Sequence, residues 1–333
     1  MSEKEAKRSE FLFCYDARMM NPNGDPDENR PRIDPITGRN LVTEFRLKRT
    51  IRDYLKDSMK PSEAIFMRVE EGNEGALKTV EDLAETYITQ TQVKKGNKTE
   101  TISQIDRNRL LSNHIDIRLF GLLFAVSGMH FKQVGPVQFA IGKSLNKVSE
   151  LTIRMTRVVP TREEAKAGTF GEKSILRYSF IVFHGFLNDI VAKQVSLSEA
   201  DVIKMMKAMW FGTDELSTTS KFGQRSRLLL RVNYSKPSAY IGDLDRFISL
   251  EKANEDVDLN KIEDIAQCYV NVQPLLSILS ANKEKIASIQ YATSDQLLCK
   301  SGTETKSFGD LIDAWSMKNN LTTANLLTEW QKD

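Results

Sequence analysis

Cysteine is scarce in this chain. Cys14, Cys268 and Cys299 are its three cysteines among 333 residues, and they stand far apart without any Cys-x-x-Cys spacing. A disulfide framework or a structural zinc site would need paired or closely spaced cysteines. The three histidines are as scattered, so the sequence does not support a histidine-based metal cluster either. We interpret the thiols as packing or surface residues and expect neither a metal nor a cofactor.

Long hydrophobic runs are absent as well. The best apolar stretch, Leu119–Val126, is far shorter than the roughly 18–20 residues that a membrane span requires. The N-terminal segment MSEKEAKRSE is charged and has no apolar centre, unlike a secretory signal. The composition, 40% hydrophobic and 28% charged, is ordinary for a soluble globular protein with one large domain or two smaller ones. We expect a cytoplasmic protein with no membrane partner.

The net charge of +2 conceals a segregation of charge along the chain. Residues 39–60 hold seven Lys/Arg against three Asp/Glu, residues 130–157 hold five against one, and residues 221–236 hold five against none. The rest of the chain holds 30 basic and 41 acidic residues. A protein surface with no charged partner mixes the two signs. This pattern instead suits a polyanion such as nucleic acid, held along one face.

A loop dense in proline and glycine follows the first predicted strand, residues 11–17. Residues 19–40 contain four prolines and two glycines, too many for regular structure. Asn, Gly and Asp can turn backbone N–H groups toward an anion, and arginines add fork-shaped donors that match phosphate. The alternative is a surface loop whose charges are solvated. The loop residues that we predict to contact phosphate are Asn21, Asn23, Gly24, Arg30, Arg32 and Arg39.

A basic helix is predicted directly after this loop, beginning at Thr43 or Glu44 and ending near Met59. Its N-terminal dipole would favour an anion at the end of the loop. Lys48 and Arg52 are four residues apart and therefore share one side of the helix. The helix cations that we predict to contact phosphate are Arg46, Lys48, Arg49 and Arg52.

A second basic segment, KFGQRSRLLLRVNY at residues 221–234, mixes cations with aromatic residues. Such a mixture suits single-stranded RNA, because cations neutralise phosphates while aromatic rings stack on bases. The alternative, equally open, is a strand whose outer face is basic. The residues concerned are Lys221, Phe222, Arg225, Arg227, Arg231 and Tyr234.

Aspartates in the first loop offer a different chemistry. Asp25 and Asp27, with Asp34 close by, can be interpreted as magnesium ligands for RNA hydrolysis. Carboxylates at short range in a proline-rich turn are more often Asx-turn residues, which bond to their own backbone. No Ser-His-Asp, Cys-His or phosphate-loop pattern occurs in the sequence to support catalysis.

The expected order of elements is strand, loop, helix, insertion, strand, hairpin, helix and strand. Residues 60–130 are predicted to be mostly helical, with Leu110–Val126 as the strongest helix there. Strands at 151–159 and 174–183 predict a long hairpin with a polar tip. From about Asp245 the chain is predicted to be mainly helical and polar. This order is compatible with an α+β fold, in which an RRM-like or ferredoxin-like β-α-β-β-α-β core carries insertions.

One block of sequence resembles a known family. Residues 21–32 read NPNGDPDENRPR, and residues 42–55 read VTEFRLKRTIRDYL. Shorter matches follow in the same order, DIRLFG at 116–121, GPVQF at 135–139 and KFGQR at 221–225. These segments resemble the crRNA-binding backbone proteins of Cascade, the type I CRISPR effector, which belong to the RAMP superfamily. The resemblance is closest to the branch found in subtypes I-B and I-C.

The resemblance implies an RRM-like palm, a helical "fingers" insertion and a β-hairpin "thumb". The palm would comprise residues 1–56 and 131–245, with the thumb hairpin at about 148–176. The fingers would be residues 57–130. Residues 246–333 would form a helical C-terminal part packed on the palm.

The resemblance also implies a non-enzymatic protein that binds guide RNA (crRNA) without sequence preference and stacks in several copies along it. The thumb of one copy would fold over the guide and displace a base at intervals, leaving the other bases free to pair with target DNA. Further partners would be the large subunit, the subunit that caps the crRNA 5′ end and the crRNA-processing subunit. On the matching segments it adds Gln138 and Gln224 to the RNA contacts, and Lys143 of the basic segment 130–157 is predicted to be a further contact. For the thumb it indicates Arg154, Met155, Arg157, Val158, Phe170 and Lys173.

Two alternatives stay open. Related type III backbone proteins cleave RNA with an aspartate in the loop after the first strand, and Asp25 and Asp27 occupy a comparable region. The chain would then be a metal-dependent endonuclease subunit. A plain single-stranded RNA-binding protein that does not stack would also fit the basic and aromatic segments.

Overall fold

The computed structural model describes nine stretches of the chain, residues 5–25, 27–28, 30–58, 65–68, 78–95, 98–126, 129–156, 170–218 and 221–331. The chain divides into two compact units. The first unit comprises Met1–Arg8, Lys48–Gln138 and Phe186–Met209, and the second comprises Ser9–Leu47, Phe139–Gly185 and Trp210–Asp333. In the stretches described, no helix has the length and apolar character needed to cross a bilayer.

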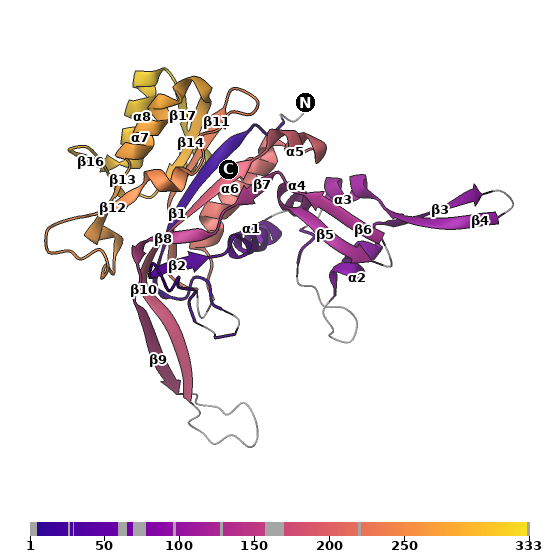
Figure 1. The fold of residues 1–333 in the computed structure, drawn as a ribbon, viewed down its shortest axis with the longest axis horizontal. Helices are drawn as coiled ribbons and strands as arrows, with labels where there is room; N and C mark the ends of the chain where they lie inside the picture. Colours follow the sequence, from indigo (N-terminus) through magenta and orange to yellow (C-terminus); the bar gives the residue numbers. More distant parts are fainter. Residues whose placement is uncertain are drawn as a thin grey trace. The chain divides into compact units, whose positions relative to one another are not determined.

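The second unit is built on one large sheet (Figure 1). Its strands are β1 (Ser9–Met20), β2 (Arg39–Val42), β8 (Gly142–Lys147), β9 (Glu150–Thr156), β10 (Phe170–Leu187), β11 (Gln224–Tyr234), β14 (Ile286–Thr293) and β17 (Thr322–Asn325). Neighbouring strands follow the order β17-β14-β11-β1-β10-β8-β2, and β9 pairs with β10 outside this path. β1 runs antiparallel to β11, with Phe13 opposite Leu229, whereas β14 and β17 are parallel.

Strand β1 lies at the centre of this sheet, and the predicted first strand is confirmed. Its residues from Phe11 to Ala17 are almost completely buried. Leu12 and Cys14 point to one face, where they join the main hydrophobic core. Tyr15 points to the other face, where its ring stacks on Phe183 with centroids 6.2 Å apart. A strand that is covered on both faces has apolar residues at successive positions and not at every second one, which explains the composition of the segment FLFCYDA.

A second sheet follows the large one in the C-terminal part of the chain. It has the order β12-β13-β15-β16, formed by β12 (Ser249–Lys252), β13 (Cys268–Asn271), β15 (Leu298–Ser301) and β16 (Glu304–Ser307). The helices of this part are α7 (Gln273–Ala281), α8 (Phe308–Asn319), α9 (Leu326–Trp330) and the 3₁₀ turns η3 (Leu244–Phe247), η4 (Ile265–Gln267) and η5 (Lys283–Lys285). The prediction of a mainly helical and polar part after Asp245 is therefore wrong. Four-residue strands are too short to show the alternation that reveals a strand in a sequence.

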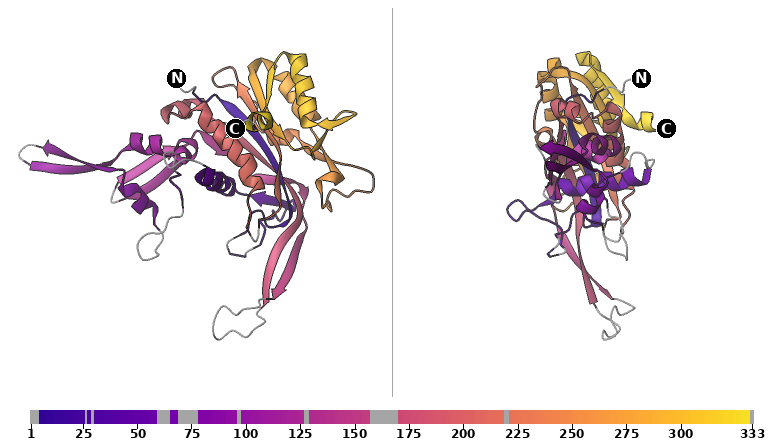
Figure 2. Two further views of the ribbon diagram at one scale, coloured as in Figure 1. Left: turned by 180° about the vertical axis from the view of Figure 1, so that it is seen from behind. Right: turned by 90° about the vertical axis from the view of Figure 1, so that its right-hand side faces the viewer.

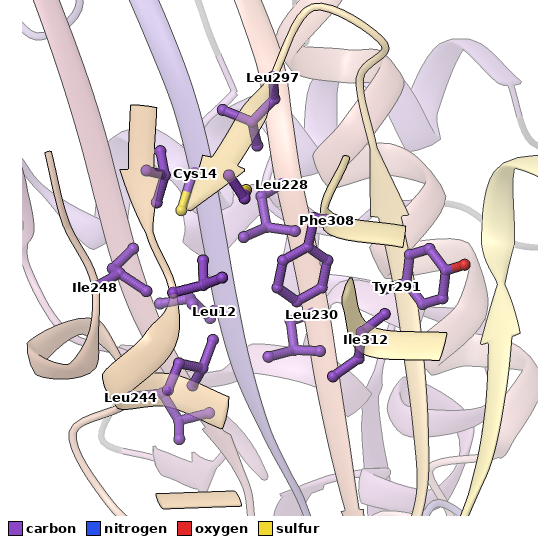
Figure 3. Packing of buried hydrophobic residues seen from close by; sticks show 14 of the residues in the cluster. Leu12, Cys14, Leu228, Leu230, Leu244, Ile248, Tyr291, Leu297, Phe308 and Ile312 are labelled. Atoms are coloured by element: carbon purple, nitrogen blue, oxygen red, sulfur yellow. The ribbon is translucent and has the colours of Figure 1, made fainter. Parts of the chain in front are cut away.

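This C-terminal part covers one face of the large sheet. Figure 3 shows Leu12 of β1 and Leu230 of β11 packed among Leu244, Phe308 and their neighbours, all of them fully buried. Burial of such side chains is worth about 1.5–3 kcal/mol each. The part that was predicted to be polar thus supplies most of the main core, 18 of its 28 buried residues.

All three cysteines lie in the core of the second unit. Burial raises the pKa of Cys268 and of Cys299 to about 12, so both thiols stay protonated near neutral pH. The interpretation of the cysteines as packing residues is confirmed.

The predicted hairpin is also confirmed, as β9 and the first part of β10 (Figure 2). Their register runs from Phe170 opposite Thr156 to Leu176 opposite Glu150. β10 is one continuous strand of 18 residues, and its later part belongs to the large sheet, with Ile181 opposite Ser144 of β8. Arg157 and Val158 of the predicted thumb lie outside the described residues, as do the side chains of Met155 and Phe170.

The first unit mixes short helices with two hairpins. Its helices are α1 (Glu44–Ser58, from Lys48 on), α2 (Val80–Glu85), α3 (Arg107–Asn113), α4 (Ile115–Phe120), α5 (Asp189–Gln194) and α6 (Glu199–Asp214, up to Met209). Its strands are β3 (Ile88–Lys95), β4 (Lys98–Ile105), β5 (Gly121–Val126), β6 (Met129–Val134) and most of β7 (Val137–Phe139). The predictions of a mostly helical segment at 60–130, and of helical fingers at 57–130, are wrong because β3–β4 and β5–β6 are antiparallel hairpins. Threonine and other β-branched residues in ITQTQVKK and KTETISQI favour strands, a signal that helical periodicity overlooks.

Gly121 ends the helix that was predicted to continue to Val126. Its φ of 78° lies in the left-handed region, where α4 stops and β5 begins. A Cβ atom on Gly121 would lie 2.2 Å from the carbonyl oxygen of Gln133, and one on Gly135 would lie 2.1 Å from the carbonyl carbon of Phe120. The backbones at DIRLFG and GPVQF therefore touch directly, which explains a glycine in each segment.

Candidate nucleic-acid interface

The loop after β1 is held by hydrogen bonds within itself. The N–H of Asp25 donates to the carbonyl of Arg30 at 2.7 Å, and the N–H of Arg32 donates to the carbonyl of Asn23 at 3.2 Å. The Asn23 side-chain oxygen accepts from the N–H and the hydroxyl of Thr43, at 2.8 and 3.0 Å. These N–H groups serve the loop and the start of α1, so they are not turned toward an anion as the sequence suggested. Asn21 is buried, and Gly24 forms a β-bridge with Pro31.

Two of the three loop arginines have carboxylate partners. Arg30 makes a bidentate pair with Glu150 at the start of β9, at 2.8 and 3.0 Å. Arg32 pairs with Asp25 at 2.9 Å. Arg39 lies on β2, opposite Lys147 of β8. Of the three, Arg39 is the one that stands beside another cation.

The loop aspartates act on their own backbone. Asp25 accepts the N–H of Asp27 at 3.0 Å, and Asp34 accepts the N–H of Ile36 at 3.0 Å. Hydrogen bonds from Thr37 and Ile36 lower the pKa of Asp34. The Asx-turn interpretation is confirmed for Asp25 and Asp34. In the described part of the chain, one group of metal-binding side chains has its ligand atoms within 4.8 Å of one another, and Asp25 and Asp27 are not in it; it consists of His184, Asp243 and Asp245.

On helix α1, Lys48 and Arg52 share one side as predicted, but that side faces protein. Both cations lie over the ring of Phe120, at 5.5 and 5.2 Å from its centroid. Arg52 pairs with the fully buried carboxylate of Asp116 at 3.1 Å, and Lys48, which is 7% exposed, lies 3.4 Å from the Gln138 amide oxygen. A buried carboxylate needs such a cation. The first role of these two side chains is therefore structural.

Other cations on and near α1 reach solvent. Arg49 is exposed and pairs with Asp53 one turn later at 3.1 Å, a contact worth about 0.3–0.5 kcal/mol. Arg46 lies close enough to Lys221 for the two charges to interact. Burial lowers the pKa of Lys221, and the repulsion from Arg46 lowers it further.

The turn before β11 presents an aromatic ring between cations. Phe222 is 71% exposed, and it lies between Lys221 and the φ 108° turn at Gly223. Arg225 donates to the carbonyl of Asp214 at 3.0 Å, and Gln224 is buried. An exposed ring with cations beside it is the arrangement on which bases of single-stranded nucleic acid stack.

Further along β11 the cations turn inward. Arg231 is fully buried, donates to Ser9 at 3.0 Å and to Gln290 at 3.1 Å, and lies over the ring of Phe11. Tyr234 is buried and donates to Glu10. The hypothesis of an RNA-facing or solvent-facing basic strand is wrong for Arg231 and Tyr234, because the sheet is covered on both faces.

Arg227 lines a pocket of about 540 Å³ in the second unit. It pairs with Asp16 at 2.9 Å and donates to Gln296 at 2.7 Å, while Tyr178 donates to Asp16 at 2.9 Å. Burial raises the pKa of Asp16 and outweighs the lowering by Arg227. Arg18 lines the same pocket, a residue that no charge-rich segment of the sequence had indicated.

Cations of the β9–β10 hairpin and of β8 do not line this pocket. Arg154 on β9 is exposed and lies 3.2 Å from Glu172 of β10, next to the half-buried Lys173. Lys143 is exposed on β8, opposite Leu41 of β2. Exposure and bonding to protein do not divide the predicted contacts into two groups, because Arg30, Arg49 and Arg154 are exposed and also pair with carboxylates. The exposed or half-exposed ones are Gly24, Arg30, Arg32, Arg39, Arg46, Arg49, Arg52, Gln138, Lys143, Arg154, Lys173, Lys221, Phe222 and Arg225.

The mixed helix-and-sheet architecture places the chain in a fold class that is also found among solved structures. A chain of a solved structure described as "CRISPR RNA-guided surveillance complex, pre-nicking" has a similar fold, with a TM-score of 0.51 and 13% identity over 94% of this chain and 100% of that one. A chain of a "CRISPR RNA-guided surveillance complex" aligns with a TM-score of 0.47 and 13% identity over 92% of this chain and 99% of that one.

Comparison of the sequence with known proteins identifies the family. The family model described as "CRISPR-associated protein Cas7" matches residues 7–271. A protein of that description from Haloferax volcanii is 30% identical over 320 residues, 90% of each chain. The chain belongs to the Cas7 family of CRISPR-associated proteins. This confirms the resemblance in residues 21–55 and the mixed helix-and-sheet fold, while the I-B or I-C branch stays a prediction.

Proposed function

We propose that this chain is the RNA-binding backbone subunit of a type I CRISPR effector. Several copies would bind along the guide RNA and present it for pairing with target DNA. The observation that carries the proposal is membership of the Cas7 family over most of the chain. The similar solved complex is described as RNA-guided, which supports guide RNA as the ligand. The other proposed partners are further copies of this chain, the large subunit, the capping subunit of the crRNA 5′ end and the crRNA-processing subunit.

The surfaces of both units support a ligand that is held by its backbone. The exposed Lys143 and Arg49 and the half-exposed Arg39 can contact phosphates without reading bases. Phe222 can stack on any base, because every base has a flat face. Sequence choice would then be left to base pairing by the guide.

The domain plan of the family supplies roles for the elements. The large sheet of the second unit, with β1 and β11 at its centre, would be the RRM-like palm, and β9–β10 would be the thumb. The fingers at 57–130 would be built around two hairpins. Residues 246–333 would form the part that completes the palm.

Phe222→Ala tests the proposal with labelled single-stranded RNAs of unrelated sequence. The wild-type protein is expected to bind them with similar affinity and to lose about 0.7 log units per phosphate contact for each tenfold rise in salt. Losing the ring is expected to weaken binding by about 1–3 kcal/mol, the value of one stacked base.

The matched control is Met317→Ala on α8, which removes an exposed apolar side chain, 77% exposed, from the same unit. Absence of binding at low salt, or affinity for one sequence alone, would contradict the proposal. So would magnesium-dependent cleavage of bound RNA that disappears in Asp25→Ala, because we propose a chain without catalytic turnover.

A further inference from the structure

A row of cations crosses four neighbouring strands in the second unit. The strands β8, β10, β1 and β11 are adjacent in the sheet in this order. Each contributes one cation, which lies near a strand end in β8, β1 and β11 and, in the longer β10, just after the pairing with β9 ends. We call these four residues the strand-end row; they are Lys147, Arg177, Arg18 and Arg225. Because adjacent strands are about 4.8 Å apart, the row spans roughly 14 Å across the sheet.

Two cavities run along this row and meet at Tyr178. A cavity of about 270 Å³ is lined by Lys147 and Arg177, and the pocket of about 540 Å³ is lined by Arg18 and Arg225. Tyr178 lines both cavities. The row therefore borders two neighbouring cavities that share Tyr178 as a lining residue.

An acidic loop lines both cavities, opposite the cations. Residues 254–264 read NEDVDLNKIED, with five acidic residues and one lysine. Glu263 pairs with Arg177 at 3.0 Å, and Asp264 pairs with Arg18 at 3.1 Å. All four of these side chains are between 42% and 61% exposed, so each pair contributes little and can exchange partners with a ligand.

The backbone of this loop is anchored independently of its ion pairs. Ile262 is 3% exposed and Ile265 is 5% exposed, and both belong to the main hydrophobic core. Breaking the two ion pairs therefore frees Arg177 and Arg18 without opening the loop. The carboxylates of Glu263 and Asp264 occupy the positions that two anionic groups of a ligand would take.

We infer that the strand-end row is a binding track for the phosphodiester backbone of a single-stranded nucleic acid, and that Glu263 and Asp264 compete with its phosphates. This inference rests on the proposed function, because it assigns a path and an internal competitor to a chain that binds polynucleotides. The track connects two groups of predicted contacts, Arg39 beside Lys147 on β2–β8 and Arg225 on β11. None of its four cations lies on α1.

Glu263→Gln tests the competitor, with Glu255→Gln as the matched control. Glu255 is exposed on the same loop and lines neither cavity, so the two variants change the net charge equally. At low salt, Glu263→Gln is expected to bind single-stranded RNA about two- to fivefold more tightly than Glu255→Gln, because an exposed carboxylate no longer competes. The double variant Arg18→Gln/Arg177→Gln is expected to flatten the log–log salt dependence by about 1.4, or about 0.7 for each phosphate that is no longer neutralised.

Two arms of the same assay show which nucleic acid occupies the track, the guide RNA or a second strand. Dependence on Arg18 and Arg177 for RNA binding by the free protein assigns the track to the guide. The same dependence for non-complementary single-stranded DNA, added to protein already saturated with RNA, assigns it to a second strand. Equal affinities of Glu263→Gln and Glu255→Gln, with an unchanged salt slope in the double variant, overturn the track while leaving the proposed function standing. A wild-type protein that binds no polynucleotide overturns the proposed function first.

Discussion

Strand β1 carries a buried carboxylate near each end, and the surroundings of the two differ. Glu10 is fully buried and is surrounded by four donors, namely His184, the hydroxyl of Tyr234 and the N–H groups of Ile241 and Gly242. Burial by itself would raise the pKa of Glu10, but these hydrogen bonds outweigh burial and lower it.

Asp16, at the other end, has fewer donors and keeps a raised pKa. Its partners are Arg227 and Tyr178, each 2.9 Å away, and the open pocket of about 540 Å³ begins beside them. Burial raises the pKa of Asp16 more than Arg227 lowers it. The Glu10 end of the strand is thus closed by protein donors, whereas at the Asp16 end the Asp16–Arg227 ion pair lies beside an open pocket.

The largest expected effect is at the closed end, in Glu10→Gln. An amide cannot accept all four hydrogen bonds, so we expect a loss of about 3 kcal/mol in the free energy of unfolding. The pKa of folded Glu10 lies below its ordinary value of 4.5, so its contribution is complete above that value and is lost as the pH falls through the folded pKa. Urea unfolding of both proteins from pH 7 down to pH 4 measures this. If Glu10→Gln lost less than about 1 kcal/mol of unfolding free energy at pH 7, or lost more in acid, the proposed difference between the Glu10 end and the Asp16 end would be wrong.

Arg227→Gln is expected to cost less, about 2 kcal/mol at pH 8, because it leaves the buried Asp16 without its cation. The pKa of folded Asp16 already lies above its ordinary value of 3.8, so the proton that relieves this penalty binds at a higher pH than in the case of Glu10. The stability difference from wild type should therefore fade at less acidic pH than in Glu10→Gln. Arg225→Gln, an exposed cation two residues earlier, is the control and should show no such fading.

The smallest effect is expected at the rim of the open end. Arg18 is 61% exposed and its pair with Asp264 is exposed too, so Arg18→Gln should change the free energy of unfolding by about 0.5 kcal/mol or less. Thermal and urea unfolding measure this directly. A loss as large as that of Arg227→Gln would show that the rim supports the fold, and the contrast between a structural end and a ligand-facing end would fail.

Local features of the fold could be predicted from the sequence. The apolar run at 11–17, the proline-rich loop, the start of α1 after Thr43 and the alternating strands of the hairpin are all decided by residues near one another. Five of the six strands after Asp245 could not be predicted, because each is four residues long and is defined by its partners; β14, with eight residues, was missed as well. Helix α1 was found, but its amphipathic pattern did not reveal that Lys48 and Arg52 face Phe120 and Asp116.

The candidate site shows the same division. Segments rich in charge indicated Lys143, Lys221 and Arg225, which the structure leaves exposed or half-exposed. Arg18 and Arg177 are isolated in the sequence and reach the strand-end row because β1 and β10 are neighbours in the sheet. Counting charges in a window cannot detect cations that strand pairing brings together.

Because of strand β10, the length of the β9–β10 hairpin is independent of the packing of the core. Since the strand passes without interruption from the pairing with β9 into the pairing with β8, residues could be added between positions 156 and 170 while every core contact is kept. Each added residue pair would extend the hairpin by about 3.3 Å. Related chains could therefore evolve hairpins of different length. A series of variants with longer hairpins would measure the distance from the sheet to the partner that the hairpin contacts.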